Sequence, residues 1–253
     1  MKLIDSGDVV ERERRFFNAQ GDWYVRLRLA IWRAIGEFNR NHEVHELYDP
    51  RGKRVLLYGC GPANDVGKYL DAGAAFVAGI DISDAEIDQA WQRARDEGYA
   101  DRVDFRVGDA HATGYADDEF DLIVGNAIIH HLEVSRALGE LRRILRPGGR
   151  AVFNEPLAHN PLLRLGRRLT PAARTPDEHP LRVEDWRVCA EIFPRCSHRE
   201  VELTSIPLMP LNLVLPRAWQ RPLARRVRSL DDRILERYPS LRKYARTTFL
   251  ILE

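Results

Sequence analysis

Short apolar runs alternate with helical segments between residues 54 and 154, and this alternation constrains the fold more than any other feature. We predict five strands, at residues 54–58, 75–80, 103–107, 120–124 and 150–154. Helical segments connect most of them, as where Val134, Leu138, Leu141 and Leu145 form one apolar stripe. This order predicts a parallel sheet covered on both faces. Ligands of such sheets bind beyond the carboxyl ends of the strands, so we expect the functional residues in the loops that follow these runs.

The rest of the chain divides into flanking parts. Residues 1–50 are predicted as an N-terminal helical segment, with a stripe at Val25, Leu29, Trp32 and Ile35. Residues 51–253 form the main domain, with insertions at about 156–185 and 206–246, and with later strands near 200–205 and at 247–252. We expect the second insertion to cover the substrate end of the sheet. Aromatic residues of the first segment either pack on the sheet edge or fold over the active site: Phe16, Phe17, Trp23, Tyr24 and Trp32.

Composition excludes several classes of protein. Of 253 residues, 44% are hydrophobic and 30% charged, which is the balance of a folded chain and not of a disordered one. A net charge of +1 argues against general nucleic-acid binding. The longest uncharged run, at 203–216, is broken by three prolines and is too short to span a bilayer. Three cysteines fit no disulfide framework or zinc spacing. The N-terminus becomes charged before any apolar stretch that could serve as a signal peptide, so we expect a cytoplasmic protein.

Basic residues are concentrated near the C-terminus. Residues 217–246 contain ten Lys or Arg and three acidic residues. A solvated helical face explains this pattern, and an anionic substrate or a membrane surface is the alternative. Because the apolar, Pro-rich run lies beside these arginines, peripheral membrane contact through 206–246 is one hypothesis for the partners of this chain.

Three features after the first three strands describe a site for an adenosine. Gly59 and Gly61 form a tight turn that lets the backbone approach a ligand, although a strand-to-helix turn uses glycine for structural reasons as well. Asp81 follows Gly59 by 22 residues, at a position where a carboxylate accepts hydrogen bonds from both ribose hydroxyls. Asp109 follows the third strand, within reach of an adenine edge.

The same loop distinguishes between adenosine cofactors. A dinucleotide site shows G-x-G-x-x-G, and the third glycine position holds Asn64 here. The carboxylate of Asp65 would repel a pyrophosphate at the helix N-terminus, but not a cationic cofactor. The residues therefore favour S-adenosylmethionine over NAD, and a nicotinamide dehydrogenase is the weaker alternative.

Four segments in order resemble the class I S-adenosylmethionine-dependent methyltransferases: VLLYGCGPANDVGKYLDAGAAFVAGIDIS, FRVGDA, DDEFDLIVGNAIIHHLE and ELRRILRPGGRAVFNEP. The resemblance covers roughly residues 54–156 and implies an α/β, Rossmann-like, seven-stranded mixed sheet whose last strand is antiparallel. It also implies the cofactor contacts. Gly59 and Gly61 would lie against the methionine part, Asp81 and Ile82 at the ribose, Asp109 and Ala110 at the adenine, and Asn126 near the sulfonium.

Two positions depart from the family pattern. Leu57 occupies the place of a frequent acidic residue, and Ala63 that of a third glycine. Asp65 is a candidate to replace the missing carboxylate. These departures motivate a second hypothesis, in which the protein keeps the fold but binds the cofactor structurally or catalyses a non-methylating reaction.

Methyl transfer needs alignment in a dry pocket, and a general base where the nucleophile carries a proton. We predict His130 near the reacting methyl, and we expect that its neighbour His131, which we assign to the substrate side, cannot face the cofactor as well. Glu155 ends the fifth strand, where it can bind an amine, orient a hydroxyl or accept its proton. Structural roles explain each of these residues equally well.

Residues 155–181 resemble a stretch found in a subset of these bacterial enzymes, which act on small-molecule or lipid-like acceptors. Its polar residues are candidates for a substrate-binding lid: His159, Asn160, Arg174, Glu178 and His179. A metal site from His159, Glu178 and His179 lacks regular spacing, so we predict no metal. The predicted activity is methylation of a small-molecule acceptor, most directly at oxygen, with nitrogen and carbon open and the oligomeric state undetermined.

Overall fold

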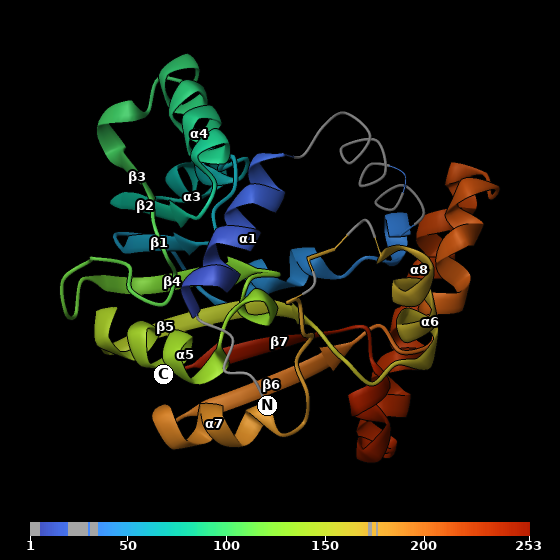
Figure 1. The fold of residues 1–253 in the computed structure, drawn as a ribbon. Coiled ribbons are helices and arrows are strands. Elements are labelled where there is room, and N and C mark those ends of the chain that lie inside the picture. The colour runs from blue at the N-terminus through green and yellow to red at the C-terminus, as the bar shows by residue number, and fades with distance from the viewer. Residues whose placement is uncertain (1–5, 20–29, 31–34, 172–173, 176) are drawn as a thin grey trace.

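The structure is a computed structural model that describes residues 6–19, 30, 35–171, 174–175 and 177–253. Within these residues seven strands form one sheet, in the order β3-β2-β1-β4-β5-β7-β6 (Figure 1). The strands are β1 (Arg54–Tyr58), β2 (Phe76–Asp81), β3 (Val103–Val107), β4 (Phe120–Asn126), β5 (Leu145–Pro156), β6 (Cys196–Val201) and β7 (Thr247–Leu252). Neighbours among β1 to β5 are parallel, and β7 is antiparallel to both β5 and β6. The predicted mixed sheet is thus confirmed.

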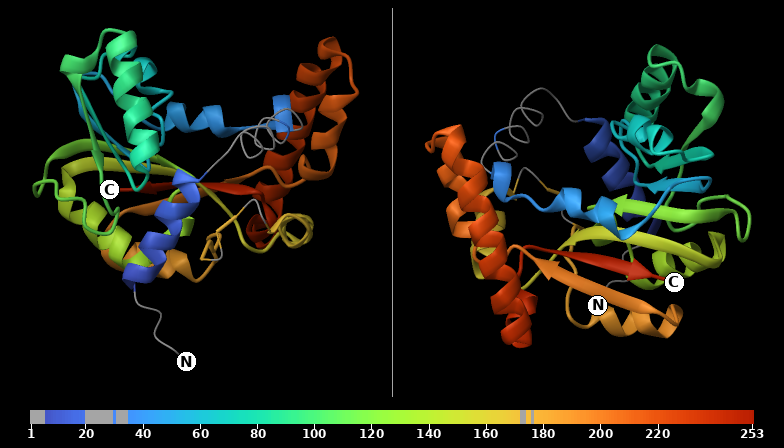
Figure 2. Two further views of the ribbon diagram at one scale, coloured as in Figure 1. Left: turned by 45° about the horizontal axis from the view of Figure 1, so that its top comes forward. Right: turned by 180° about the vertical axis from the view of Figure 1, so that it is seen from behind.

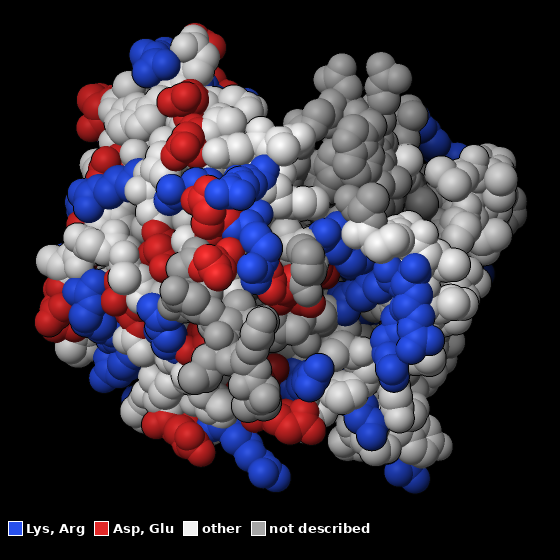
Figure 3. Space-filling view, viewed as in Figure 1, with Lys and Arg blue, Asp and Glu red and all other residues white. Residues whose placement is uncertain are grey.

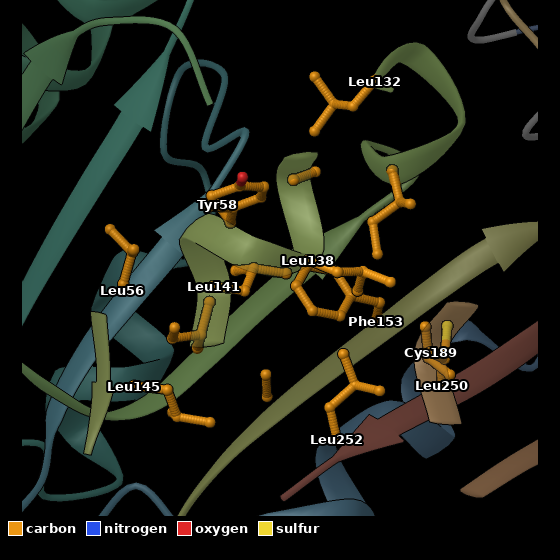
Figure 4. Packing of buried hydrophobic residues seen from close by; sticks show 14 of the residues in the cluster. Leu56, Tyr58, Leu132, Leu138, Leu141, Leu145, Phe153, Cys189, Leu250 and Leu252 are labelled. Carbon is orange, nitrogen blue, oxygen red and sulfur yellow. The ribbon is translucent and has the colours of Figure 1, made fainter. Parts of the chain in front are cut away.

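Helices cover both faces of the sheet. They are α1 (Ser6–Asn18), α3 (Val66–Asp71), α4 (Asp84–Asp96), α5 (Val134–Ile144), α6 (Pro161–Leu169), α7 (Asp185–Ile192) and α8 (Arg217–Arg237). Shorter 3-10 turns are η1 (Gly36–Phe38), η2 (Asn41–Leu47), η3 (Ala100–Arg102), η4 (Ile129–His131), η6 (Ile206–Leu213) and η7 (Pro239–Tyr244). On one face, α5 and α7 pack on the sheet, with Leu138 and Leu141 against Phe153 and Leu250 (Figure 4). On the other face, α3 and α4 bury residues such as Tyr69.

The C-terminal insertion forms a separate layer at one end of the molecule. Helix α8 packs on η1 and η6 around Phe38, Met209 and Val227, and it stands beside α6 (Figures 1 and 2). No helix of the described residues is both long enough and apolar enough to cross a membrane.

Some predicted element bounds were wrong. The strand expected near 200–205 is β6, which ends at Val201, because Asp231 of α8 accepts hydrogen bonds from the backbone N–H groups of Leu203 and Thr204 and so ends the ladder. Strand β5 begins at Leu145, earlier than the predicted residue 150. The stripe residues Val25, Leu29 and Trp32 lie outside the described residues, as do Trp23 and Tyr24.

Candidate active site

A cavity of about 540 Å³ lies at the carboxyl ends of β1, β2 and β4, as expected for a sheet of this kind. Its walls come from the β1–α3 loop, the loops after β2, β3 and β4, helix α1 and the segment around residues 174–178. All seven residues predicted to bind the cofactor line it: Gly59, Gly61, Asp81, Ile82, Asp109, Ala110 and Asn126. No described residue of 206–246 does, so the expectation that the second insertion covers this end was wrong for the described part of the chain.

The glycine loop has a left-handed backbone at three positions. Gly59 has φ +69°, and a Cβ there would lie 2.8 Å from the side chain of Ile128. Gly61 has φ +52°, and its N–H donates to Asp81 Oδ2 at 2.8 Å. Ala63, at the departure from the family pattern, also has φ +52°. The loop thus keeps a glycine-like backbone at Ala63 although the residue has a Cβ, which costs roughly 1–2 kcal/mol.

Asp81 is held in place by backbone donors from two directions. Its Oδ2 accepts from Gly61, and its Oδ1 accepts from the N–H of Ser83 at 3.0 Å. Burial raises the pKa of Asp81, and these donors partly offset that rise. Each carboxylate oxygen has a further lone pair, so the group remains able to accept from two hydroxyls.

A histidine that the sequence analysis missed fixes Asp109. The N–H of His111 donates to Asp109 Oδ1 at 2.8 Å, and its Nδ1 lies 2.7 Å from the same oxygen. Because Nε2 of His111 accepts from the N–H of Glu133 at 2.9 Å, its Nδ1 carries the proton and donates to Asp109. This hydrogen bond lowers the pKa of Asp109, so the carboxylate stays ionised. The Asp-Ala-His order after β3 was the available signal.

The methionine side of the predicted site contains Leu57 and Asn126. The side-chain oxygen of Asn126 accepts from Nδ2 of Asn154 at 2.8 Å, which orients the Asn126 amide at the end of β4. Leu57 lines the cavity with an apolar surface. Asp65 lies at the cavity wall and pairs with Lys68, and its role as a replacement carboxylate stays a prediction.

Glu155 is fully buried and directed at a loop of the protein. Its Oε1 accepts from the N–H groups of Ile128 and Ile129, both at 2.9 Å, and its Oε2 lies 2.8 Å from Nδ1 of His130. The predicted direct contact of Glu155 with substrate is therefore wrong in this structure, because its carboxylate is occupied and does not line the cavity. Glu155 is instead a positioning residue for His130.

His130 and His131 both line the cavity, and that only His130 faces the cofactor stays a prediction. The 3-10 turn η4 places their ring centroids 4.2 Å apart. Burial lowers the pKa of His130. Burial also acts to lower the pKa of His131, but Glu13, with the charges of Glu178 and Glu155, more than offsets this, and the net pKa is raised.

Helix α1 closes one side of the cavity. Oε2 of Glu13 lies 3.2 Å from Nδ1 of His131, and the ring of Phe17 packs edge-on against His131. Asn18 accepts a hydrogen bond from the hydroxyl of Ser83 at 2.7 Å. Phe16 also lines the cavity, so these two aromatic residues fold over the site. Sequence reasoning missed Glu13, because nothing local distinguishes it from the other charged residues of α1.

The segment at 174–178 contributes three residues to the cavity, and two of them were predicted. Nη1 of Arg174 donates to Oε1 of Glu178 at 3.1 Å, and Thr175 lies between them in sequence. Ligand atoms of His130, His131 and Glu178 lie within 4.8 Å of one another, close enough to hold one metal ion. This group differs from the trio considered in the sequence.

Three other predicted substrate residues do not line the cavity. Asn160 caps α6 by accepting from the N–H groups of Leu162 and Leu163, and its amide donates to the carbonyl of Tyr244. His179 is exposed, and its Nδ1 bonds the carbonyl of Asp177. His159 is half-buried, away from the cavity. Local backbone geometry explains Asn160 and His179 without substrate.

Comparisons with known proteins agree with this architecture. Residues 56–153 match a family model described as a methyltransferase domain. The chain is 38% identical over 100 residues to methyltransferase GfsG of Streptomyces halstedii, which covers 39% of this chain and 36% of that protein. It is 32% identical over 105 residues to 27-O-demethylrifamycin SV methyltransferase of Amycolatopsis mediterranei, which covers 41% and 39%. The matched part is thus under two fifths of the length of these relatives.

Among solved structures, geranyl diphosphate C-methyltransferase from Streptomyces coelicolor A3(2) aligns over 98% of both chains, with a TM-score of 0.66 and 14% identity. Similarity at this identity shows a shared fold. The sheet order and the match of residues 56–153 to a methyltransferase domain are what the predicted class I S-adenosylmethionine-dependent methyltransferase family would show.

Proposed function

We propose that the protein transfers a methyl group from S-adenosylmethionine to a small-molecule acceptor, most directly at a protonated oxygen. One observation carries this proposal: a single cavity joins the carboxylates of Asp81 and Asp109 to the imidazoles of His130 and His131. The first pair suits the ribose and adenine of a nucleoside, and the second pair suits a group that must lose a proton.

The residues present fit the cofactor. Asp81 retains acceptor capacity for the ribose hydroxyls, and the ionised Asp109 suits the adenine amino group. Gly61 leaves room beside the loop, because the nearest atom to a Cβ built there is 3.6 Å away. When bound, the sulfonium supplies an electrophilic methyl group, and the protein aligns the acceptor with it and excludes water.

His130 is our candidate general base. Its lowered pKa keeps the imidazole neutral near pH 7, and Glu155 accepts the proton on Nδ1. In that tautomer Nε2 has a lone pair available, and it can take the proton from a hydroxyl group of the methyl acceptor. The carboxylate of Glu13 raises the pKa of His131. We expect His131, Arg174 and Glu178 to bind polar groups of the acceptor.

Titration calorimetry with S-adenosylmethionine and S-adenosylhomocysteine tests the site. Transfer of a radiolabelled methyl to a panel of phenols, alcohols, amines and carbon acids tests the reaction. We expect binding of both ligands and labelling of hydroxylated compounds. Binding without labelling of any class would favour the non-methylating alternative, which the departures at Leu57 and Ala63 motivate. Absence of binding would refute the site.

The His130, His131 and Glu178 group requires a separate test for a metal. Each member already has a protein partner of complementary charge or hydrogen bonding, namely Glu155, Glu13 and Arg174. We therefore expect a chelator such as EDTA to leave the rate of methyl transfer unchanged. A loss on chelation that Zn²⁺ restores would show that the group holds a metal.

A further inference from the structure

Helix α6 presents an apolar stripe to solvent. Leu162, Leu165 and Leu169 follow the i, i+3, i+7 spacing of one helix face, and all three are exposed, Leu169 to 73%. Leu163 lies on another side of the helix and packs against the cluster that joins η6 and α8. An amphipathic helix of a folded chain ordinarily turns its apolar face inward. Helix α6 is fixed to the protein and still exposes an apolar face.

A second exposed apolar group lies at the same end of the molecule, where η6 meets α8 (Figures 1 and 2). Val214 is 77% exposed and Trp219 is 68% exposed, and Leu213 is also exposed. Tryptophan has an apolar ring and a polar N–H, and it is enriched where a protein meets the boundary of a lipid bilayer. We call the α6 stripe and these residues, taken together, the apolar end surface.

Basic side chains surround this surface. Exposed arginines come from both helices: Arg164 and Arg168 from α6, and Arg217, Arg225 and Arg226 from α8. Neither 161–169 nor 213–230 contains an acidic residue. Figure 3 shows the basic side chains gathered over α6, with uncharged surface beside them. Apolar residues bordered by arginine are typical of a surface that binds anionic lipid.

The charge also argues against a second copy of the chain as the occupant. A symmetric dimer through this surface would bring the same arginines of two copies together without acidic partners from the surface itself. An anionic bilayer offers apolar volume for the leucines and negative charge for the arginines at the same time.

The side of helix α6 opposite the leucine stripe faces toward the active-site cavity. Burial lowers the pKa of Arg167 in α6 to about 10, and the charges of Glu178 and Arg174 act on it. Both of those residues line the cavity. At its start, α6 follows directly from the end of β5 through the cap at Asn160. Helix α6 therefore stands between the leucine stripe and the polar groups of the site.

We propose that the apolar end surface binds the face of an anionic lipid bilayer. This places the cavity at the membrane and assigns the acceptor to amphiphiles, with a polar head for the site and an apolar tail in the bilayer. The assignment of the acceptor rests on the proposed function, whereas membrane binding does not.

Vesicle flotation tests the proposal, with phosphatidylcholine vesicles that contain or lack phosphatidylglycerol. The full chain should float with the anionic vesicles, and added salt should weaken this binding. The double variant Leu165→Ser, Leu169→Ser should lose at least about tenfold in vesicle affinity. Arg164→Gln with Arg168→Gln should lose about tenfold or more. Val183→Ser is the matched control, because Val183 is an exposed apolar residue outside α6 and α8, and the affinity of this variant should not change.

Cofactor affinity, measured for every variant by calorimetry, separates this proposal from the proposed function and reports that the variants are folded. Wild-type protein that stays unbound to anionic vesicles would overturn membrane binding, and so would equal binding by all variants. Light scattering that shows a dimer dissociated by the leucine variants would identify a second copy as the occupant and overturn the proposal. Vesicle binding without cofactor binding would leave the surface standing and refute the proposed function.

Discussion

The predicted cofactor side and the proposed acceptor side of the cavity are built in different ways. On the predicted cofactor side, each polar group follows its own strand, and a residue two positions further on holds each of the two carboxylates, Ser83 for Asp81 and His111 for Asp109. On the acceptor side, groups from distant segments converge. His130 depends on Glu155, which is 25 residues away, and His131 contacts Glu13 of α1. Local motifs thus specify most of the predicted cofactor side, whereas tertiary packing specifies the proposed acceptor side.

From this difference we expect substitutions on the predicted cofactor side to weaken cofactor binding, and substitutions on the proposed acceptor side to lower kcat without changing cofactor affinity. His130→Gln should reduce kcat by about 10²–10⁴-fold, because it removes a positioned base, while cofactor affinity stays the same. The measurement is kcat with the hydroxylated acceptor that the methyl-transfer panel identifies, beside calorimetry of the cofactor. In the wild type, kcat should fall on acidification with a midpoint under pH 6.5, because burial lowers the pKa of His130.

His179→Gln is the control for that variant, since His179 is exposed and lies outside the cavity lining. Glu155→Gln should lower kcat and alter the pH profile, which a purely structural role would not do. If His130→Gln turned over at the wild-type rate, His130 would not be the base.

On the cofactor side, Asp81→Ala should weaken S-adenosylhomocysteine binding by about a hundredfold or more. The reason is that hydrogen bonds to a charged group contribute about 1.5–3 kcal/mol each, and two hydroxyls lose theirs. Calorimetry measures the affinity, and Asp84→Ala, an exposed residue in the first turn of α4, is the control. An unchanged affinity for Asp81→Ala would mean that the ribose lies elsewhere.

The same contrast explains how far the sequence could predict the structure. The sheet and the cofactor-side residues were accessible, because strand period, glycine turns and a carboxylate after each strand are local patterns. Glu13 could not be predicted from the sequence, since its partner His131 lies over a hundred residues away and only the packing of α1 brings the two together. Asn160 was assigned to substrate because a polar residue near a predicted pocket looks functional, and its position before Pro161 was the missed sign of a helix cap.

The stabilisation that the contact between α1 and His131 provides should depend on pH. Glu13 holds the pKa of His131 above its ordinary value near 6.5, so the folded state binds that proton more tightly than the unfolded state does. The stabilisation is therefore complete below pH 6.5 and is lost as pH rises through the raised pKa. We expect the difference in unfolding free energy between wild type and Glu13→Gln to shrink as pH rises through that window.

Urea denaturation at a series of pH values measures this difference. The lowered pKa of His130 gives the unfolding free energy a pH dependence of opposite sign. This contribution largely cancels in the difference between wild type and variant, because Glu13→Gln leaves Glu155, the partner of His130, in place. Glu11→Gln, on the same helix but paired with the exposed Arg15, is the control and should show no such trend. A difference independent of pH would show that Glu13 does not stabilise protonated His131.

The smallest expected effect concerns Ala63, where the cofactor side departs from its family pattern. Replacement by glycine relieves roughly 1–2 kcal/mol of left-handed backbone strain. It also removes a buried methyl, which lowers the stability by about 0.8 kcal/mol. The greater conformational entropy of the unfolded chain lowers the stability by a further 0.4–1 kcal/mol, roughly. These contributions nearly cancel, so Ala63→Gly should change the unfolding free energy by under about 1 kcal/mol and leave cofactor affinity unchanged. Ala90→Gly, buried in α4 with an ordinary helical backbone, should lose about 2 kcal/mol. Equal losses in urea denaturation would mean that Ala63 bears no strain and that the departure must be explained by contact with the cofactor instead.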